Sequence, residues 1–574
     1  MKSLKIKLSR KSYLFLFLII SIWFMSFCSY TSPFFYFDYS PDNNCFFTVG
    51  KALMHGIIPY KDVFEQKGPY VYLIHGIAYL IDHYSLVGIF PFEVISLFFT
   101  IYIVYKIALL YTDREYAYVV AILSPTFQLF HPYYDYGDTV ESLLFPAMLS
   151  LIYVLLKGDK NNFNISRTSW ILQGFLVGLT FLMKYTLLGS WIIFYISIFI
   201  YYLIHKFWRK IIKLIQWSLV GFLIAVLPWL IFFILTRSWS AFIHVYFYEN
   251  MHTYMLSNNS FFAKFIESLT IYSSFLRDDP LIFLCGFLGY VYLLASNTTF
   301  KTTVGKTIFV LMMIVNAAFI VYGYHSSQVY QYYELAFFPY LLVPTGFIII
   351  RLLNHFKFRV NSQNESFVIM GSVLISFFLV LGVNNNILSS RIFPNNSSVT
   401  LSNTNHPQEP AQIVFGKIMR KESDSHPTML NYGSIDMGFY TTSGALPSNY
   451  YFQNYNIPYQ KDPRILNNQR NIIKRHKVQW IVLNTPMGKT IHQWHGDSLA
   501  KGKISDGNLN PGTSKIAHSL LKNYHIVAHH TQSFESTNVT YWLLKRRSLD
   551  KDKHKVYHNK ITIKRNLLHQ GAVN

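Results

Sequence analysis

Apolar segments about as long as a membrane is thick recur along the first two thirds of the sequence. A helix that crosses a bilayer needs roughly 20 apolar residues, because its backbone finds no hydrogen-bond partners in lipid. About eleven segments meet or approach this length: 13–30, 86–110, 116–131, 138–156, 170–183, 186–204, 214–236, 280–296, 306–323, 334–351 and 366–385. The sequence therefore predicts a polytopic α-helical membrane protein.

The composition agrees with this prediction. Of the 574 residues, 52% are hydrophobic, 18% are aromatic and only 14% are charged, whereas a soluble chain carries roughly a quarter charged residues. The formal net charge of +22 first reports membrane topology, so we predict no nucleic-acid partner. The spacing of Cys28, Cys45 and Cys285 supports neither a zinc site nor a disulfide framework.

The basic residues predict the orientation of the spans. No small-residue cleavage site follows the first apolar segment, which favours a membrane span over a signal peptide. With a cytoplasmic N-terminus, the even-numbered turns at 157–167, 205–213, 301–306 and 351–359 lie inside, and all are basic. We therefore expect a multi-pass protein of the cell (plasma) membrane, in which everything after about residue 385 is extracytoplasmic.

The C-terminal part differs in composition, being rich in Asn, Ser, His and Lys. We expect a transmembrane domain at 1–385, an extracytoplasmic α/β domain at 386–547 and a basic, disordered tail at 548–574. Strands are predicted at 428–433, 479–485, 525–531 and 540–546, and helices at 411–421 and 514–524.

Polar residues gather in the connections that this topology places outside. The first outer loop, 31–85, contains Asp38, Asp42, Asp62, Glu65 and Lys67, whereas the middles of the spans are almost free of charge. A transporter binds its substrate near the midplane, on broken helices. A site at the outer interface instead suits a lipid with a polar head. Within the loop, 43–56 and 69–82 are too short to span and are expected to lie in the interface.

The loop sequence "PDNNCFFTVGKALMHGIIPYKDVFEQKGPYVYLI" resembles the first outer loop of bacterial integral-membrane glycosyltransferases of the GT-C fold. Protein O-mannosyltransferases and the aminoarabinose transferases that act on lipid A belong to the same superfamily. The shared pattern comprises Asp42, Gly50, Gly56, Pro59-Tyr60, Asp62 and Phe64-Glu65-Gln66-Lys67-Gly68-Pro69. This chain departs from it at Glu65-Gln66, where Asp-His is common, and at Asn43, where many relatives have a second acid.

Further segments resemble the same family in order along the chain. They are "YGDTVESLLFPAMLSLIYVLLK", "GFLVGLTFLMKYTLLG", "HVYFYENMHTY", "YQYYELAFFPYLL" and, in the tail, "NYGSIDMGFYTTSGALPSNYYFQN".

The resemblance implies a transferase whose donor is a sugar, hexose or pentose, on a polyprenyl phosphate or diphosphate. The sugar would pass, with inversion, to a hydroxyl of a glycan, glycolipid or protein acceptor at the outer face. Two alternatives remain open: a flippase or transporter of a lipid-linked glycan, and a non-catalytic glycan-assembly protein. The transporter alternative predicts polar groups in the middle of the spans, which the sequence does not show.

Inverting transfer needs a base for the acceptor hydroxyl, and a carboxylate is suitable. The resemblance assigns this role to Asp42, with Asp38 as the nearby competitor. Fixed cations stabilise a leaving phosphate, so Lys67 and Lys184 are the first candidates, with Tyr332 and Tyr333 as further donors. Other candidate site residues are Asp62, Glu65, Glu141, Asn250 and His325.

Each residue also has a purely structural interpretation. Asp42 could cap a helix, the two lysines could anchor the interface, and Glu141 could favour a helix start. Asp62 could only fix a turn, and the tyrosines could belong to an aromatic belt. No HxxxH or DxD cluster argues for a metal, so no metal site is predicted; a divalent cation stays open, since some relatives use one.

Overall fold

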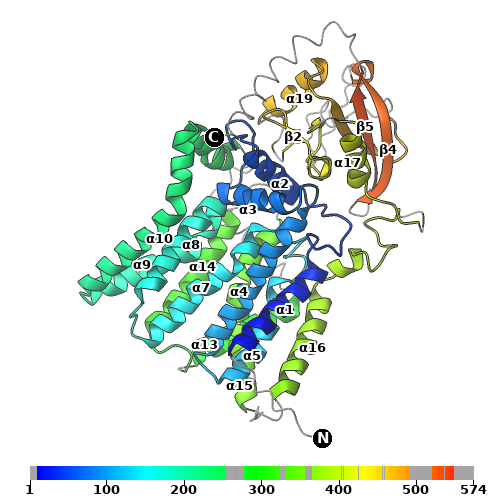
Figure 1. Ribbon diagram of the computed structural model, residues 1–574. Coiled ribbons are helices and arrows are strands. Elements are labelled where there is room, and N and C mark those ends of the chain that lie inside the picture. Colours follow the sequence, from blue (N-terminus) through cyan, green and yellow to red (C-terminus); the bar gives the residue numbers. More distant parts are fainter. Residues whose placement is uncertain are drawn as a thin grey trace.

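The computed structural model describes residues 10–253, 266, 277, 279–296, 298–322, 330–355, 365–401, 404, 406–423, 426–455, 457, 459, 461–491, 520–534 and 537–547. A helical bundle makes up most of the molecule, and a smaller domain containing a β-sheet sits at one end of it (Figure 1). The predicted tail at 548–574 lies outside the described residues.

Helices of the bundle follow the predicted apolar segments. They are α1 (Arg10–Cys28), η1 (Leu86–Ile89) with α4 (Phe90–Ala108), α5 (Arg114–Leu123), α6 (Pro125–Gln128), α7 (Val140–Lys160), α8 (Arg167–Lys184), η2 (Tyr185–Leu187), α9 (Gly189–Ile204), α10 (Trp208–Leu235), α11 (Trp239–Phe242), η3 (Ile243–Thr253), α13 (Pro280–Ala295), α14 (Thr303–Tyr322), η4 (Gln331–Phe337), α15 (Pro339–His355) and α16 (Glu365–Val383). Each segment expected to span the membrane overlaps at least one of these helices.

Five of the described helices are long and apolar enough to cross a membrane by length and composition alone. They become six if η4 and α15, which meet at a bend of 49°, form one broken span. Others, including α1, α9, α13 and α16, are apolar but fall below that length. The polytopic membrane class is thus confirmed, while the number of eleven spans stays a prediction.

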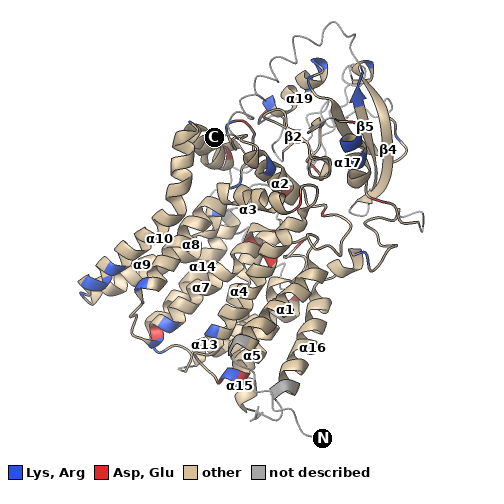
Figure 2. Ribbon diagram, viewed as in Figure 1, with Lys and Arg blue, Asp and Glu red and all other residues tan. Residues whose placement is uncertain are grey.

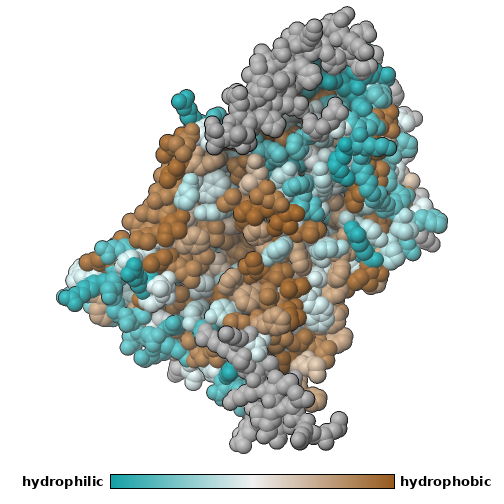
Figure 3. Space-filling view, viewed as in Figure 1, coloured by the Kyte–Doolittle hydropathy of each residue, from teal (hydrophilic) through white to brown (hydrophobic). Residues whose placement is uncertain are grey.

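Charged and apolar residues occupy different zones along the length of the bundle (Figure 2 and Figure 3). Lys and Arg gather on turns at the end of the bundle away from the sheet domain, such as the turn between α9 and α10 (Figure 2). On the face shown in Figure 3, a broad apolar region covers the bundle between this end and the polar sheet domain. This separation is typical of a membrane protein with basic turns on one side.

Two short helices cover the end of the bundle that faces the sheet domain. They are α2 (Pro41–Met54) and α3 (Pro69–Ile81), and they lie across the long helices (Figure 1). Gly50 allows them to pack closely, because a Cβ there would lie 2.5 Å from the backbone nitrogen of Gly76. They correspond to the segments 43–56 and 69–82, which were expected to lie in the interface outside the spans.

The C-terminal domain contains a five-stranded mixed sheet in the order β2-β1-β3-β5-β4. Its strands are β1 (Thr428–Asn431), β2 (Leu446–Pro447), β3 (Trp480–Pro486), β4 (Tyr524–Phe534) and β5 (Thr537–Arg546). Both neighbours of β1 are parallel to it, whereas β5 pairs antiparallel with β3 and β4.

Helical segments of this region are η5 (Asn386–Ser389), α17 (Ala411–Lys421), α18 (Phe439–Ser443) and α19 (Arg464–Lys474). The four predicted strands and the helix at 411–421 are present. The prediction of a helix at 514–524 falls largely on 514–519, outside the described residues, and Tyr524 already begins β4.

Helix α2 connects the two parts of the molecule. The Nζ of Lys51 donates to the carbonyl of Tyr440 at 2.7 Å, and the Thr441 hydroxyl donates to Asn44 Oδ1 at 2.8 Å. Both donors and acceptors are buried. The sheet domain therefore holds the helix that carries Asp42 in a defined position.

Candidate active site

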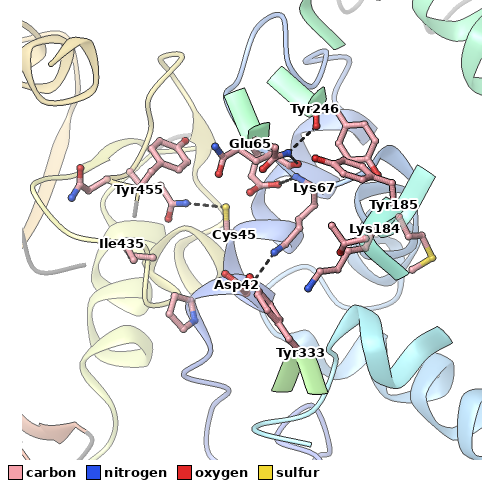
Figure 4. A pocket seen from close by; sticks show the side chains of 17 residues that line it. Asp42, Cys45, Glu65, Lys67, Lys184, Tyr185, Tyr246, Tyr333, Ile435 and Tyr455 are labelled. Atoms are coloured by element: carbon pink, nitrogen blue, oxygen red, sulfur yellow. Dashed lines mark hydrogen bonds and ion pairs between the residues drawn. The ribbon is translucent and has the colours of Figure 1, made fainter. Parts of the chain in front are cut away.

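A pocket opens where the first loop, the end of α8 and the C-terminal domain meet (Figure 4). Its empty volume is about 750 Å³, the open mouth included. The lining residues are Pro41, Asp42, Cys45, Glu65, Gln66, Lys67, Met183, Lys184, Tyr185, Thr186, Tyr246, Asn250, Tyr333, Ile435, Gln453, Asn454 and Tyr455.

Asp42 lies in the first turn of α2 and faces this pocket. Pro41 starts the helix, and the Ser40 hydroxyl accepts the backbone N–H of Asn43, so Ser40 is the N-cap and the cap interpretation of Asp42 is wrong. Its side chain keeps 47% of its surface exposed. A carboxylate in the first turn is favoured by the helix dipole, and its exposure makes Asp42 accessible to a ligand.

Two groups contact the Asp42 carboxylate from distant parts of the chain. The Nζ of Lys67 lies 3.6 Å from Asp42 Oδ2, and the Tyr332 hydroxyl donates to the same oxygen at 2.9 Å. Figure 4 shows Lys67 and Asp42 pointing toward one another. The predicted base and one predicted phosphate-binding lysine therefore share one site.

The Gly-Pro break after Lys67 sets the position of this lysine. Gly68 packs its backbone on α8, because a Cβ there would lie 2.1 Å from the carbonyl oxygen of Leu182. The carbonyl of Lys67 accepts the hydroxyl of Tyr60 at 2.7 Å, and the Tyr72 hydroxyl, which donates mainly to Glu65, lies 2.9 Å from the same carbonyl oxygen. The backbone is thereby held firmly, and the Lys67 side chain is left to reach the pocket.

Lys184 enters the pocket from the C-terminal end of α8. Its ammonium forms an ion pair with the buried Glu141 at the start of α7. It also lies 3.3 Å from the centre of the Tyr333 ring, a cation–π contact. The pocket thus has two lysines on one side, and each has an acidic partner.

Glu65 lines the pocket but is engaged by the protein itself. Its Oε2 accepts the Tyr72 hydroxyl and, at 2.9 Å, the backbone N–H of Lys67. Burial raises the pKa of Glu65, while the charge of Lys67 and these hydrogen bonds act against the rise. Glu65 therefore positions Lys67, and Asp42 is the more accessible acid.

The structure brings together most of the other predicted residues. Asn250 lines the pocket and donates to the carbonyl of Gln66 at 2.9 Å. Glu141 and Tyr332 do not line it but contact Lys184 and Asp42, respectively. His325 lies outside the described residues.

Two acids of the first loop are not brought into the pocket. Asp62 is exposed, and its carboxylate accepts the Ile58 N–H at 3.0 Å, so it fixes the turn as its alternative interpretation predicted. Asp38 is buried and accepts the Ser40 N–H at 2.8 Å and the Asn43 amide at 2.9 Å. Its carboxylate therefore shapes the start of α2.

Sequence reasoning missed the wall that the C-terminal domain contributes. Ile435, Gln453, Asn454 and Tyr455 come from this domain. They fall in or beside the tail segment that resembled the family, but nothing in its spacing predicts which side chains reach a pocket. Gln453 donates to Cys45 Sγ at 2.9 Å and accepts the Asp436 N–H at 2.7 Å, which ties the wall to α2.

Comparison with known proteins identifies the fold. The family described as dolichyl-phosphate-mannose-protein mannosyltransferase matches residues 66–232. Two crystal structures of ArnT from Cupriavidus metallidurans match over 93% of this chain and 98% of theirs. The structure bound to undecaprenyl phosphate has a TM-score of 0.53 at 12% identity, and the apo structure 0.55 at 10%. The protein has the GT-C fold.

The expected resemblance to integral-membrane GT-C glycosyltransferases is thereby confirmed. No curated protein matches the sequence. The matched range 66–232 of the GT-C chain begins at Gln66, runs through Lys67, Glu141 and Lys184, and leaves Asp42 and the C-terminal wall outside. The roles of individual pocket residues therefore rest on their geometry.

Proposed function

We propose that the protein is an inverting glycosyltransferase that moves a sugar from a polyprenyl-phosphate-linked donor to an acceptor hydroxyl at the outer face of the membrane. One observation carries the proposal: an accessible carboxylate, Asp42, shares a pocket with two lysines, Lys67 and Lys184. The GT-C fold and the ArnT structure bound to undecaprenyl phosphate support a lipid-linked donor.

Asp42 would act as the general base. Its carboxylate takes the proton of the acceptor hydroxyl while the acceptor oxygen forms a bond to the anomeric carbon of the sugar. The bond from that carbon to the phosphate oxygen breaks, and polyprenyl phosphate leaves. Attack from the face opposite the phosphate inverts the anomeric carbon.

Lys67 and Lys184 would stabilise the leaving phosphate. Negative charge grows on the phosphate as the sugar departs, so fixed cations favour the transition state over the ground state. Both lysines already have acidic partners, Asp42 and Glu141. These partners hold the ammonium groups in place before the donor binds, which reduces the reorganisation needed during the reaction.

The orientation of the site belongs to the same proposal. The pocket is lined in part by residues of α2 and of the C-terminal domain, and these elements lie at the end of the bundle opposite the basic turns (Figure 2). Basic turns are typically cytoplasmic, so the pocket and the sheet domain would be extracytoplasmic. Glycan, glycolipid and protein acceptors, and hexose or pentose donors, all fit this proposal.

The test compares Asp42→Asn with Asp62→Asn in membranes that contain equal amounts of each variant. Sugar release from polyprenyl-phosphate donors is measured. Asp42→Asn should lower turnover by roughly 10²–10⁴-fold, because the base is lost, with little change in donor affinity. Asp62→Asn, an exposed acid outside the pocket, should behave as the parent. Normal turnover in Asp42→Asn, or movement of intact glycolipid without transfer by the parent, would contradict the proposal.

A further inference from the structure

Two side-chain amides line the pocket without a hydrogen-bond partner for their nitrogen. Gln66 belongs to the first loop and Asn454 to the C-terminal domain. They are 8% and 1% exposed, respectively. Within the described part of the chain, Gln66 Nε2 and Asn454 Nδ2 have no partner. Buried amide nitrogens in native proteins are normally paired, so this pair requires an explanation.

Hydrogen bonds between the first loop and the C-terminal domain fix the backbone segments that carry both amides. The N–H of Phe64 donates to the Tyr450 carbonyl at 2.9 Å, and the Tyr455 hydroxyl donates to the Phe64 carbonyl at 2.7 Å. These bonds join the two segments, 64–66 and 450–455, into one seam at the pocket wall. Gln66 and Asn454 therefore line the pocket from backbone segments that are held in place.

Neighbouring polar groups at this seam are already engaged. Gln453 uses both ends of its amide, on Cys45 and on the Asp436 backbone. Glu65 accepts from Tyr72 and from the Lys67 backbone. Gln66 and Asn454 are therefore the amide donors that the described residues leave for a ligand at this seam.

The charges at the pocket indicate what kind of ligand the amides meet. Two acidic and two basic side chains line it: Asp42, Glu65, Lys67 and Lys184. An acidic sugar would face the two carboxylates, and a cationic sugar would face the two ammonium groups. Uncharged oxygens match the amide donors and leave the existing ion pairs intact.

We propose that Gln66 and Asn454 bind the hydroxyl groups of an uncharged sugar, and that this sugar is the one carried by the donor. The inference rests on the proposed function. Gln66 precedes Lys67 directly, and both side chains line the pocket. Since the donor sugar is bonded to the phosphate, the groups next to the phosphate-binding lysine are placed to meet that sugar.

The experiment measures binding of two probes to the full-length protein in detergent, without an acceptor. One probe is undecaprenyl phosphate, and the other is undecaprenyl phosphate carrying a neutral hexose. The parent should bind the hexose-bearing lipid more tightly than the bare lipid. Gln66→Leu and Asn454→Leu should each reduce that preference roughly fivefold, the loss of one hydrogen bond, while the affinity for the bare lipid stays unchanged.

Gln469→Leu is the matched control. Gln469 is a buried amide of the C-terminal domain whose Nε2 also has no partner among the residues that the structure describes, but it does not line the pocket. This variant should keep the full preference for the hexose. A melting curve of each variant identifies any that fail to fold, and the two test positions come from different parts of the chain, so one can fail without losing the test.

Three results would overturn the inference or its basis, and they differ from one another. An unchanged preference in both leucine variants would mean that water alone fills the seam. A tighter complex with a lipid carrying a cationic amino sugar than with the hexose would contradict the uncharged class. Binding of neither probe, with no transfer by the parent, would instead overturn the proposed function.

Discussion

The backbone N–H of Gly68 donates a hydrogen bond to the carbonyl oxygen of Met183, at 3.2 Å. This bond joins the first loop to the last turn of α8. The residues beside it, Lys67 and Lys184, therefore enter the same pocket although 116 residues lie between them in the sequence. The Gly68-Pro69 turn thereby determines that the two lysine side chains lie in one pocket.

Gly68→Ala should destabilise the protein and lower its activity. The new Cβ would lie 2.1 Å from the Leu182 carbonyl oxygen, so the loop must shift. Overpacking of this kind costs about 1–3 kcal/mol. Gly371→Ala is the control, since nothing lies within 4 Å of its Cβ and alanine favours a helix. Thermal melting in detergent checks both variants, and equal melting temperatures would contradict the prediction.

Lys67→Ala should lower turnover by about 10²–10³-fold, the range seen when one oxyanion donor is removed. Its side chain is 20% exposed and its partner Asp42 is 47% exposed, so the variant should stay folded. Lys67→Arg should keep part of the activity, because the charge remains while the geometry changes. Sugar-transfer rates of both variants, measured at a saturating donor concentration, test this prediction. Parental turnover in Lys67→Ala would show that the lysine only anchors the loop.

Lys184→Ala should affect both activity and stability. Removing the lysine leaves Glu141 buried without its partner, which costs about 3–5 kcal/mol. The double variant Lys184→Ala/Glu141→Gln should recover much of the stability, since the buried charge is gone, but not the transfer activity. Melting temperature and turnover are measured on the same preparations. Recovery of turnover by the double variant would contradict a role of Lys184 in binding the phosphate.

Asp436→Asn should change how stability depends on pH. Burial raises the pKa of Asp436 from 3.8 to about 6, so its stabilising contribution is full below pH 3.8 and is lost as pH rises through about 6. Asparagine keeps an acceptor for the Gly438 and Phe439 N–H groups. Relative to the parent, the variant should therefore gain up to about 3 kcal/mol between about pH 4 and pH 7.

Nearby Lys51 acts in the same direction. Burial lowers the pKa of Lys51 to about 7, and Asp436 opposes that change. Without Asp436 the lysine releases its proton at a still lower pH, which again favours the variant as pH rises. Melting temperatures of both proteins across this range check the prediction. A constant difference between them would contradict it.

Position 448 should be accessible from outside the cell. Ser448 is exposed on the C-terminal domain, and Arg209 is exposed at the basic end of the bundle. In a Cys285→Ala background, which removes an exposed thiol, Ser448→Cys should react with a membrane-impermeant reagent in intact cells. Arg209→Cys should react only after the membrane is opened. The reverse pattern would place the pocket in the cytoplasm.

Local sequence patterns determined most of the architecture. Apolar length predicted where the helices of the bundle lie, because a lipid-facing backbone must close its hydrogen bonds within each segment. Short strand-type segments at 428–433, 479–485, 525–531 and 540–546 predicted the strands that became β1, β3, β4 and β5. The resemblance of the first loop also singled out Asp42 and Lys67. These features depend on residues close together in the chain, so they can be read from it directly.

Only the tertiary structure decided how the pocket closes. The Tyr332 hydroxyl reaches Asp42 across 290 positions of the chain, and the wall containing Asn454 meets Gln66 from a separate domain. The packed helices also separated Asp42, accessible in the pocket, from Asp38, buried beneath the start of α2. Such contacts depend on how whole helices and domains pack on one another, and the spacing of residues in the sequence does not predict that packing.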